Sequence, residues 1–377
     1  MVGVSVIYHH FPHYRAPIVR ELSINGRNNY NFWGSLDEVE GIKPFRGEAD
    51  VCIQPLGFRR WGRFWLLSGY SRPLFDKSNK VIIVLANPNM PATIAIALLG
   101  RFLGKKVIFW AHGWLKKHPA KISRLRNLYF SLADCVLVYG ERAARIAYDE
   151  GFAKDKVHPI YNSLDFEQAQ LSLAKIESTT QLSSRPQNLF VESDRPLLIC
   201  TARLTTLCQF DILFHAARQL ADCSRPVNIL LIGDGPEREA LENLSSELGI
   251  TVCFYGSCYD EDEIARLIYW SDITVSPGKI GLTAVHSLTY GTPAITHGDF
   301  DAQMPEVEAI KPGVSGAFFE RNNATDLART ISEWLNRDVD RCVTREACQA
   351  IIAEKWNPAN QRKLIEDVIE NLIGTVS

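Results

Sequence analysis

The chain has 377 residues, of which 46% are hydrophobic and 22% charged, and its formal net charge is −2. This composition is that of an ordinary globular protein. The length exceeds the roughly 250–300 residues that one hydrophobic core usually serves, which excludes a single small domain and predicts two.

The small net charge hides an asymmetry between the two halves. Residues 1–180 carry 24 Lys and Arg against 15 Asp and Glu, a balance of +9, whereas residues 181–377 carry 17 against 28, a balance of −11. The basic half is a candidate to face an anionic surface or ligand. A chance partition of charge over two solvated surfaces is the alternative.

Cysteine usage and the N-terminus limit the compartment. The nine cysteines are odd in number and form no Cys-x-x-Cys pair, which favours a reduced, cytoplasmic setting over a disulfide framework or zinc site. "MVGVSVIYHHFPHYR" has no basic stretch followed by a long apolar one, so it predicts a first strand instead of a signal peptide. No apolar run reaches the roughly 18 residues that a membrane-spanning helix needs.

Short apolar runs rich in β-branched residues alternate with helical patterns along the whole chain. The expected strands are 4–10, 81–86, 106–112, 135–140 and 157–162 in the first half, and 197–203, 228–235, 252–257, 273–278 and 293–298 in the second. Strand, helix and strand in succession predict parallel sheets with right-handed crossovers, and therefore two doubly wound α/β domains. The polar, Ser-rich segment 178–196 is the best linker candidate, and 356–377 predicts a C-terminal helix.

Ligands of doubly wound sheets bind beyond the carboxyl ends of the strands, so residues that follow each strand are candidates. In the first half, His112 and Gly113 lie at the carboxyl end of the expected strand 106–112, directly after its apolar residues. The loop after the first strand adds further candidates: His10, His13, Tyr14 and Arg15. The His-His-x-x-His spacing suggests a metal, but no Cys or carboxylate accompanies it in this short loop, so no metal site is expected.

In the second half, the stretch 276–293 predicts a strand, a turn with Gly278 and Gly281, and a helix that starts near Leu282. The backbone amides of Gly281, Leu282 and Thr283 and the positive end of the helix dipole suit a diphosphate. Lys279 adds a positive charge in the same turn. His286, one helical turn further, is either a ribose ligand or an ordinary helix histidine.

Two more strand ends carry candidates. Arg203 follows the first strand of the second half, where a guanidinium can bond two phosphate oxygens at once; a surface salt bridge is the alternative. Gly233 and Gly235 follow the next strand and precede Pro236. This pattern fits a ligand-binding turn and equally a plain connection between a strand and a helix.

Two basic aromatic segments, 57–67 and 114–130, account for much of the positive charge. The second contains Lys116, Lys117, Lys121, Arg124 and Arg126. Basic residues interleaved with aromatic ones are typical of contact with anionic lipid headgroups. An ordinary solvated helix face is the alternative, and nucleic acid is not expected as a partner because no recognised binding motif accompanies the charge.

The order of these motifs resembles the GT-B glycosyltransferases, in particular glycosyltransferase family 4 (group 1). "ADCVLVYGERAARIAYDEGFAKDKVHPIYNSLD" is similar to the element that ends the first domain of that family. "TARL", "IGDGPEREAL", "YGSCYDEDEIARLIYWSDITVSPG" and "GLTAVHSLTYGTPAITHGDFDAQMPEVEAI" follow in the order and spacing of the family. Each motif is unspecific alone, but five in order cover nearly the whole chain.

The resemblance implies two Rossmann-like domains that face each other across a cleft. The first, 1–177, would hold the acceptor; the second, 190–355, would hold the nucleotide sugar; and the helix 356–377 would cross back to the first. Arg203 matches the arginine that neutralises the donor diphosphate, and His112 matches the histidine near the transferred sugar.

This sequence departs from the family in two places. Cys208 and Gln209 lie where the family usually has a lysine, and Gly278 and His286 lie where it has paired glutamates eight positions apart. One fixed positive charge fewer raises the barrier to diphosphate departure unless Lys279 substitutes for the lysine.

The resemblance implies a retaining, metal-independent glycosyltransferase of bacterial polysaccharide, lipopolysaccharide or capsule assembly. It would have no cofactor, use a nucleotide-diphosphate sugar as donor and a glycan or lipid-linked glycan as acceptor, and work as a peripheral protein at the cytoplasmic face of the cell membrane. A catalytically weak or inactive partner subunit that binds a nucleotide sugar or glycan is the alternative. A nucleotide-sugar epimerase is disfavoured, because no carboxylate is placed beside His112 as acid or base.

Overall fold

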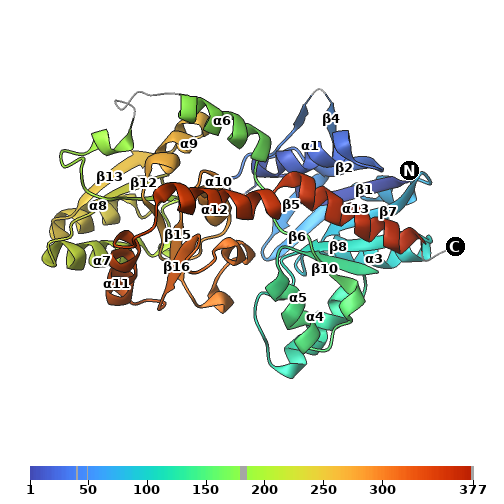
Figure 1. Ribbon diagram of the computed structural model, residues 1–377. Coiled ribbons are helices and arrows are strands. Elements are labelled where there is room, and N and C mark those ends of the chain that lie inside the picture. The colour runs from blue at the N-terminus through green and yellow to red at the C-terminus, as the bar shows by residue number, and fades with distance from the viewer. Residues whose placement is uncertain (40, 49, 179–184, 375–377) are drawn as a thin grey trace. The chain divides into compact units, whose positions relative to one another are not determined.

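The computed structural model describes residues 1–39, 41–48, 50–178 and 185–374. The chain forms two compact units, Met1–Asp165 together with Trp356–Ser377, and Phe166–Lys355. Each unit is a parallel sheet covered by helices, so the predicted α/β class with two Rossmann-like domains is confirmed (Figure 1).

The first unit contains an eight-stranded sheet in the order β10-β9-β8-β7-β1-β2-β4-β3, with only β3 antiparallel among its described pairs. Its strands are β1 (Gly3–His10), β2 (Asn29–Ser35), β3 (Gly47–Glu48), β4 (Val51–Pro55), β7 (Asn79–Leu85), β8 (Lys106–Ala111), β9 (Cys135–Val138) and β10 (Val157–Pro159). Its helices are α1 (Ala16–Asn25), α2 (Ser71–Phe75), α3 (Pro91–Phe102), α4 (Ala120–Phe130), α5 (Glu141–Asp149) and α13 (Pro358–Gly374). A separate antiparallel hairpin joins β5 (Gly57–Trp61) to β6 (Phe64–Ser68).

The central strands of this sheet are apolar on both faces because helices cover both. One core layer contains side chains of α3 and α5, and the other contains those of α1 and α13. Strand β2 was not predicted, because its sequence "NYNFWGS" places polar residues where a buried strand usually has apolar ones. It pairs in parallel with β1 all the same.

The second unit contains a six-stranded parallel sheet in the order β13-β12-β11-β14-β15-β16. The strands are β11 (Leu197–Thr201), β12 (Asn228–Ile232), β13 (Thr251–Gly256), β14 (Ile273–Ser276), β15 (Ala294–His297) and β16 (Gly316–Phe319). The helices are α6 (Phe166–Ser178), α7 (Phe210–Asp222), α8 (Arg238–Leu248), α9 (Glu261–Trp270), α10 (Leu282–Thr289), α11 (Ala324–Leu335) and α12 (Arg341–Glu354). Helices α7 and α11 cover one face, and α6 and α9 cover the other.

The C-terminal helix α13 packs against α1 of the first unit, as the resemblance implied (Figure 1). Ile365 and Ile369 are fully buried in the core layer that contains α1. The Gln361 side chain accepts a hydrogen bond of 2.8 Å from the Ser163 hydroxyl and donates one of 2.5 Å to the Tyr161 carbonyl oxygen. Apolar burial and buried polar bonds therefore fix this helix to the first unit.

The segment predicted as a linker, 178–196, is only partly described, because 179–184 lie outside the described residues. Its second part forms a short 3-10 turn, Pro186–Leu189, and then enters β11. The Gln187 side chain donates a hydrogen bond of 2.7 Å to the Trp270 carbonyl oxygen, which ties this turn to α9.

Candidate active site

The turn between β14 and α10 presents backbone amides at the carboxyl edge of the second sheet. Gly281 precedes α10 with φ +47°, a conformation that glycine adopts at little cost. Within the described part of the chain, the N–H groups of Gly281 and Leu282 have no hydrogen-bond acceptor. The amide of Thr283, also predicted to bind phosphate, is directed to the Ile280 carbonyl oxygen at 3.2 Å. Two of the three predicted amides are thus available to an anion.

Gln303 holds this turn in place, and sequence analysis did not identify it. Its side chain is buried, and Oε1 accepts a hydrogen bond of 3.0 Å from the Ile280 amide. Its Nε2 donates to the carbonyl oxygen of Gly278 at 3.2 Å and to the Thr296 hydroxyl at 2.8 Å. One side chain therefore fixes both sides of the turn before α10 begins.

The predicted glycines of the second unit make room for the loop that follows β11. A Cβ atom on Gly233 would lie 1.9 Å from the Ala202 carbonyl oxygen, one on Gly235 2.2 Å from that of Leu204, and one on Gly278 2.0 Å from that of Leu207. These contacts are with backbone, which cannot move aside as a flexible side chain can. Close packing of the loop 202–208 accounts for the three glycines, and their contact with a ligand stays a prediction.

Both departures from the family pattern meet at this contact. The Gly278 amide donates a hydrogen bond of 3.0 Å to the Cys208 carbonyl oxygen. Cys208 ends the 3-10 turn Thr206–Cys208, and Gln209 follows it with φ +51°. The Gln209 side chain donates a hydrogen bond of 2.9 Å to the Asn322 side chain. The backbone of Cys208, where the family has a lysine, therefore packs directly against Gly278, where the family has its first glutamate.

Two cationic side chains of this edge are exposed. Arg203 lies in the loop 202–208, directly after β11, and Lys279 lies in the turn before α10. In the described ranges, neither side chain takes part in an ion pair or a hydrogen bond. The alternative of a surface salt bridge at Arg203 thus has no support within these ranges, and both charges are open to a ligand at this edge of the sheet.

His286 lies on α10, one turn after these amides, and it contacts a carboxylate from another helix. Its Nε2 is 2.7 Å from Oε1 of Glu261, and the same oxygen accepts a hydrogen bond from the Tyr290 hydroxyl. Burial raises the pKa of Glu261, but the bonds from His286 and Tyr290 outweigh it, so that the pKa lies below its ordinary value. Sequence analysis missed Glu261, because only the fold brings α9 and α10 together.

The carboxyl edge of the first sheet contains an arginine surrounded by aromatic rings. Arg15 is 9% exposed, and its guanidinium carbon lies 5.6 Å from the ring centre of Tyr8, 5.2 Å from that of Trp110 and 5.0 Å from that of Tyr139. Such cation–π contacts hold a charge in a partly desolvated place. Arg15 also donates a hydrogen bond to the Tyr139 hydroxyl.

The structure brings His112 and Arg15 together through Tyr139, whose ring centre is 5.1 Å from that of His112. Part of the His112 side chain is exposed. The surrounding protein nevertheless desolvates the imidazole, and this desolvation, followed by the charge of Arg15, lowers the pKa of His112 to about 4. Burial, followed by the charges of His10 and Arg15, lowers the pKa of His9 to about 3. His112 and His9 are therefore uncharged at neutral pH.

The other acceptor-side candidates lie around the same edge. His10 is buried beside His9, whereas His13 is exposed and contacts the ring of the half-buried Tyr14. Gly113 has φ +68°, and a Cβ there would lie 2.6 Å from the Val138 side chain. Gly113 thus has a packing role, and its contact with an acceptor stays a prediction.

The basic aromatic segment 114–130 differs from its expected arrangement. Trp114 and Phe130 are buried in the core, and the Arg126 side chain is held by Glu150 and by the Lys116 carbonyl oxygen. The exposed apolar side chains of α4 are aliphatic: Ile122, Leu125 and Leu128. In the segment 57–67, the aromatic residue that stays exposed to the largest extent is Trp61, at 71%, at the end of the β5–β6 hairpin.

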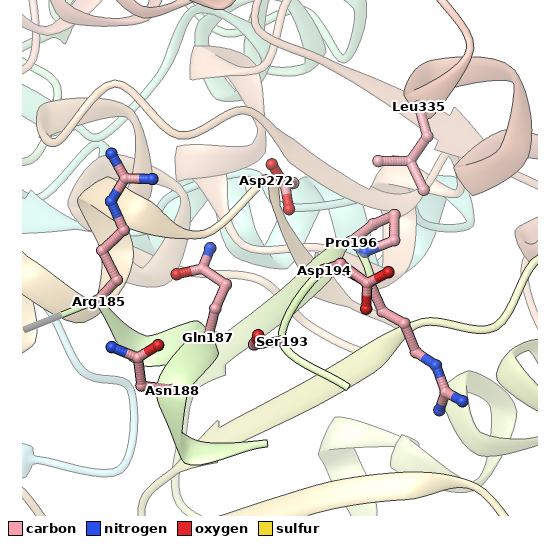
Figure 2. Close-up of a pocket in the computed structure, with 9 residues that line it drawn as sticks. Arg185, Gln187, Asn188, Ser193, Asp194, Pro196, Asp272 and Leu335 are labelled. Carbon is pink, nitrogen blue, oxygen red and sulfur yellow. The ribbon is translucent and has the colours of Figure 1, made fainter. Parts of the chain in front are cut away.

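A cavity of about 570 Å³ lies at the opposite edge of the second sheet. Pro196 and Asp272, which precede β11 and β14, line it together with Arg185 and Gln187 (Figure 2). Figure 2 shows mostly polar side chains around this space. Because it lies at the amino ends of the strands and away from Arg203 and α10, we do not assign the donor to it.

The described ranges contain no group of three or more His, Cys, Asp or Glu side chains placed to hold a metal ion. They also contain no helix that is long and apolar enough to cross a membrane.

Most of the second unit matches a known family. The family model described as glycosyl transferases group 1 matches residues 184–355. Residues 184–355 belong to the group 1 glycosyltransferase family. The match covers β11 to α12, and with them the loop that carries Arg203 and the helix that carries His286.

Among characterised relatives, a 2-deoxystreptamine glucosyltransferase of Streptomyces kanamyceticus is 25% identical over 52% of this chain and 50% of its own length. A GDP-mannose-dependent phosphatidylinositol dimannoside mannosyltransferase of Mycobacterium tuberculosis is 31% identical over 40% of this chain and 39% of its own. The chain thus spans half or less of the length of these two relatives.

A solved structure shares the fold of nearly the whole chain. The Anabaena protein HepE in complex with UDP superimposes with a TM-score of 0.71 at 15% identity, covering 98% of this chain and all of that one. At this identity the likeness concerns the fold alone, which is GT-B.

Proposed function

We propose that the protein is a retaining, metal-independent glycosyltransferase that transfers a sugar from a nucleotide-diphosphate sugar to a hydroxyl group of a glycan or lipid-linked glycan. The observation that carries this proposal is the set of free hydrogen-bond donors and positive charges at the carboxyl edge of the second sheet. Two free amides at the start of α10 lie at the same carboxyl edge of the sheet as two exposed cations, Arg203 and Lys279, that have no partner within the described ranges. A diphosphate is the ligand whose charge and acceptor oxygens match these groups.

The chemistry needs charge stabilisation more than a protein nucleophile. When the sugar leaves, negative charge grows on the diphosphate, and fixed donors that meet this charge lower the barrier. Arg203 can give two parallel hydrogen bonds, and the Gly281 and Leu282 amides give two more without any reorganisation. Lys279 would supply the charge that the family lysine supplies elsewhere. The departing phosphate would then help to take the acceptor proton.

The relatives support a nucleotide sugar as donor and a glycan or glycolipid as acceptor. The solved HepE structure contains UDP, and the mycobacterial relative is GDP-mannose-dependent and acts on phosphatidylinositol dimannoside. We therefore place the reaction in polysaccharide, lipopolysaccharide or glycolipid assembly. The nucleotide base stays open between these examples.

In the first unit, we assign His112 to orient the transferred sugar and Arg15 to the acceptor side. An uncharged imidazole is both a hydrogen-bond donor and an acceptor, which suits sugar hydroxyl groups. The lowered pKa of His112 keeps it in this form at neutral pH.

We also propose that the first unit meets anionic membranes from the cytoplasmic side, as a peripheral protein. Its net charge is positive, and α4 exposes Ile122, Leu125 and Leu128 at 51%, 68% and 65% next to Lys121 and Arg124. Exposed aliphatic side chains beside basic ones are the composition of an interfacial helix.

A catalytically inactive nucleotide-sugar-binding subunit is the second candidate. The absence of a lysine at Cys208 and Gln209 favours it, because one fixed charge fewer faces the leaving group. Binding would persist in such a protein while turnover would not.

The experiment measures binding and turnover separately. UDP, GDP, ADP, CMP and dTDP and their common sugar conjugates are first screened by thermal shift, and each ligand that stabilises the protein is then assayed for donor hydrolysis in EDTA. Stabilisation with hydrolysis supports the proposal. Stabilisation without hydrolysis or transfer to any acceptor supports the inactive subunit. No stabilisation by any nucleotide contradicts both.

A further inference from the structure

The carboxylate of Glu261 lies between two helices at the carboxyl edge of the second sheet. Glu261 is the first residue of α9, which follows β13, and it reaches α10, which follows β14. Its Oε1 is 2.7 Å from His286 Nε2 and also accepts the hydrogen bond of the Tyr290 hydroxyl. His286 and Tyr290 are four residues apart, so they lie on one face of α10.

The two oxygens of this carboxylate have different surroundings. The bonds from His286 and Tyr290 both end on Oε1, and in the described part of the chain Oε2 accepts no hydrogen bond. The Glu261 side chain is 37% exposed, against 17% for His286. One oxygen is therefore used to fix the side chain, and the other is open to a ligand.

The ligand of such an oxygen must be a hydrogen-bond donor. The bonds from His286 and Tyr290 hold the pKa of Glu261 below its ordinary value despite burial, so the group is ionised at neutral pH and only accepts hydrogen bonds. An alcohol, above all a vicinal diol, meets this requirement without adding charge. A further phosphate would be repelled.

The place of the carboxylate points to one particular diol. His286 comes four residues after Leu282, which corresponds to about 6 Å along the helix axis. Glu261 thus contacts α10 about one helical turn from the amides to which we assign the diphosphate. In a nucleotide, the ribose hydroxyl groups lie at this kind of distance from the phosphates.

We infer that Glu261 binds the ribose hydroxyl groups of the donor nucleotide, and that His286 and Tyr290 are positioning residues that hold its carboxylate. This inference rests on the proposed function. It assigns the acceptor of the ribose hydrogen bonds to α9, whereas sequence analysis looked for it at position 286 of α10. The replacement of a carboxylate by His286 leaves the site with a carboxylate, supplied from a different helix.

The test compares nucleotides with and without ribose hydroxyl groups. Calorimetry measures the dissociation constants of UDP and GDP and of their 2′-deoxy and 3′-deoxy forms for the wild type, Glu261→Gln and Glu261→Asp. The wild type should prefer the ribonucleotide by about 10-fold or more, as is usual for hydrogen bonds to a charged group. Glu261→Gln should lose most of this preference while it binds the deoxynucleotides as the wild type does.

A second variant separates direct binding from an indirect effect. His286→Gln should keep part of the preference for the ribonucleotide, because the Glu261 carboxylate remains. The inference would be overturned if His286→Gln lost this preference completely while Glu261→Gln kept it unchanged. Asp262→Asn is the matched control, since this neighbouring carboxylate bonds to Lys175 at 2.6 Å and to Ser172 instead. It should bind like the wild type.

Failure of the proposed function and failure of the Glu261 assignment give different binding results. If no nucleoside diphosphate binds the wild type, the proposed function fails and this inference with it. If a nucleotide binds but the ribose preference is the same in the wild type and in the folded Glu261→Gln and Glu261→Asp variants, the assignment of Glu261 alone is overturned.

Discussion

Replacement of Gly278 by alanine adds one methyl group where backbone already lies. The new Cβ would be 2.0 Å from the Leu207 carbonyl oxygen and 3.0 Å from the Cys208 carbonyl carbon. Gly278 is outside the left-handed region of backbone conformation, so alanine meets no conformational obstacle there. The effect of the substitution is therefore steric.

The cost follows from the contact that must open. Overpacking of a filled site costs about 1–3 kcal/mol, and weakening of the hydrogen bond from the Gly278 amide to Cys208 adds about 1 kcal/mol. The sum is about 2–4 kcal/mol. In a unit of about 190 residues, each kcal/mol lowers the melting temperature by about 2–4 °C, so we expect a loss of about 4–16 °C. Because the loop 202–208 carries Arg203, donor affinity should fall as well.

Thermal unfolding followed by circular dichroism measures this loss, with Gly298→Ala as the matched control. Gly298 follows β15 at the same edge, and a Cβ there would be 3.4 Å from the Phe318 Cβ, an ordinary contact. We expect this control to change stability by no more than about 0.5 kcal/mol. Equal melting temperatures of the two variants would refute the steric reasoning.

The same reasoning applies to Gly278→Glu, which restores the glutamate of the family pattern. The carboxylate arrives with the same Cβ, so the variant should be less stable than the wild type and should gain no activity. A stable and more active Gly278→Glu protein would show that the loop 202–208 yields and that Gly278 is not required by packing.

Two further predictions concern the first unit. The pKa of His9 is lowered to about 3, so as the pH falls below about 6.5 only the unfolded chain protonates this histidine, and the free energy of unfolding should decrease by about 2 kcal/mol between pH 6.5 and 5. Urea unfolding of the wild type and His9→Gln at these two pH values measures this decrease. The same dependence of stability on pH in both proteins would contradict the prediction. Neutralisation of Lys116, Lys117 and Arg124 together should weaken binding to anionic vesicles by about 100-fold, at about 1 kcal/mol for each charge, and leave donor affinity unchanged. Unchanged vesicle binding would exclude this face as the membrane contact.

The buried strands were predictable from sequence because parallel sheets covered on both faces have continuous apolar runs. β8, β11 and β12 lie within predicted segments, and β7 begins two residues before its predicted segment 81–86. β2 was not, since its pairing with β1 outweighs the polar residues in its sequence. The turn before α10 was predictable for a different reason, because its glycines lie at or just after the end of a predicted strand.

The partners of that turn were not predictable, because they come from elsewhere in the chain. Gln303 reaches back from beyond β15, and Glu261 belongs to the preceding helix. A glycine after a strand also has the same appearance whether it admits a phosphate or a neighbouring backbone. Only the contacts of Gly233 and Gly278 with the loop 202–208 reveal the second role.

The most direct test of the account is the turnover number of Arg203→Ala with the donor that the wild type accepts, measured in EDTA. Arg218→Ala is the control, since Arg218 is an exposed arginine of α7 that pairs with Asp222. We predict a loss of at least about 100-fold for Arg203→Ala, as for other groups that stabilise a leaving charge, and wild-type turnover for the control. Near-normal turnover of Arg203→Ala would contradict the central claim that this edge of the second sheet stabilises the departing diphosphate.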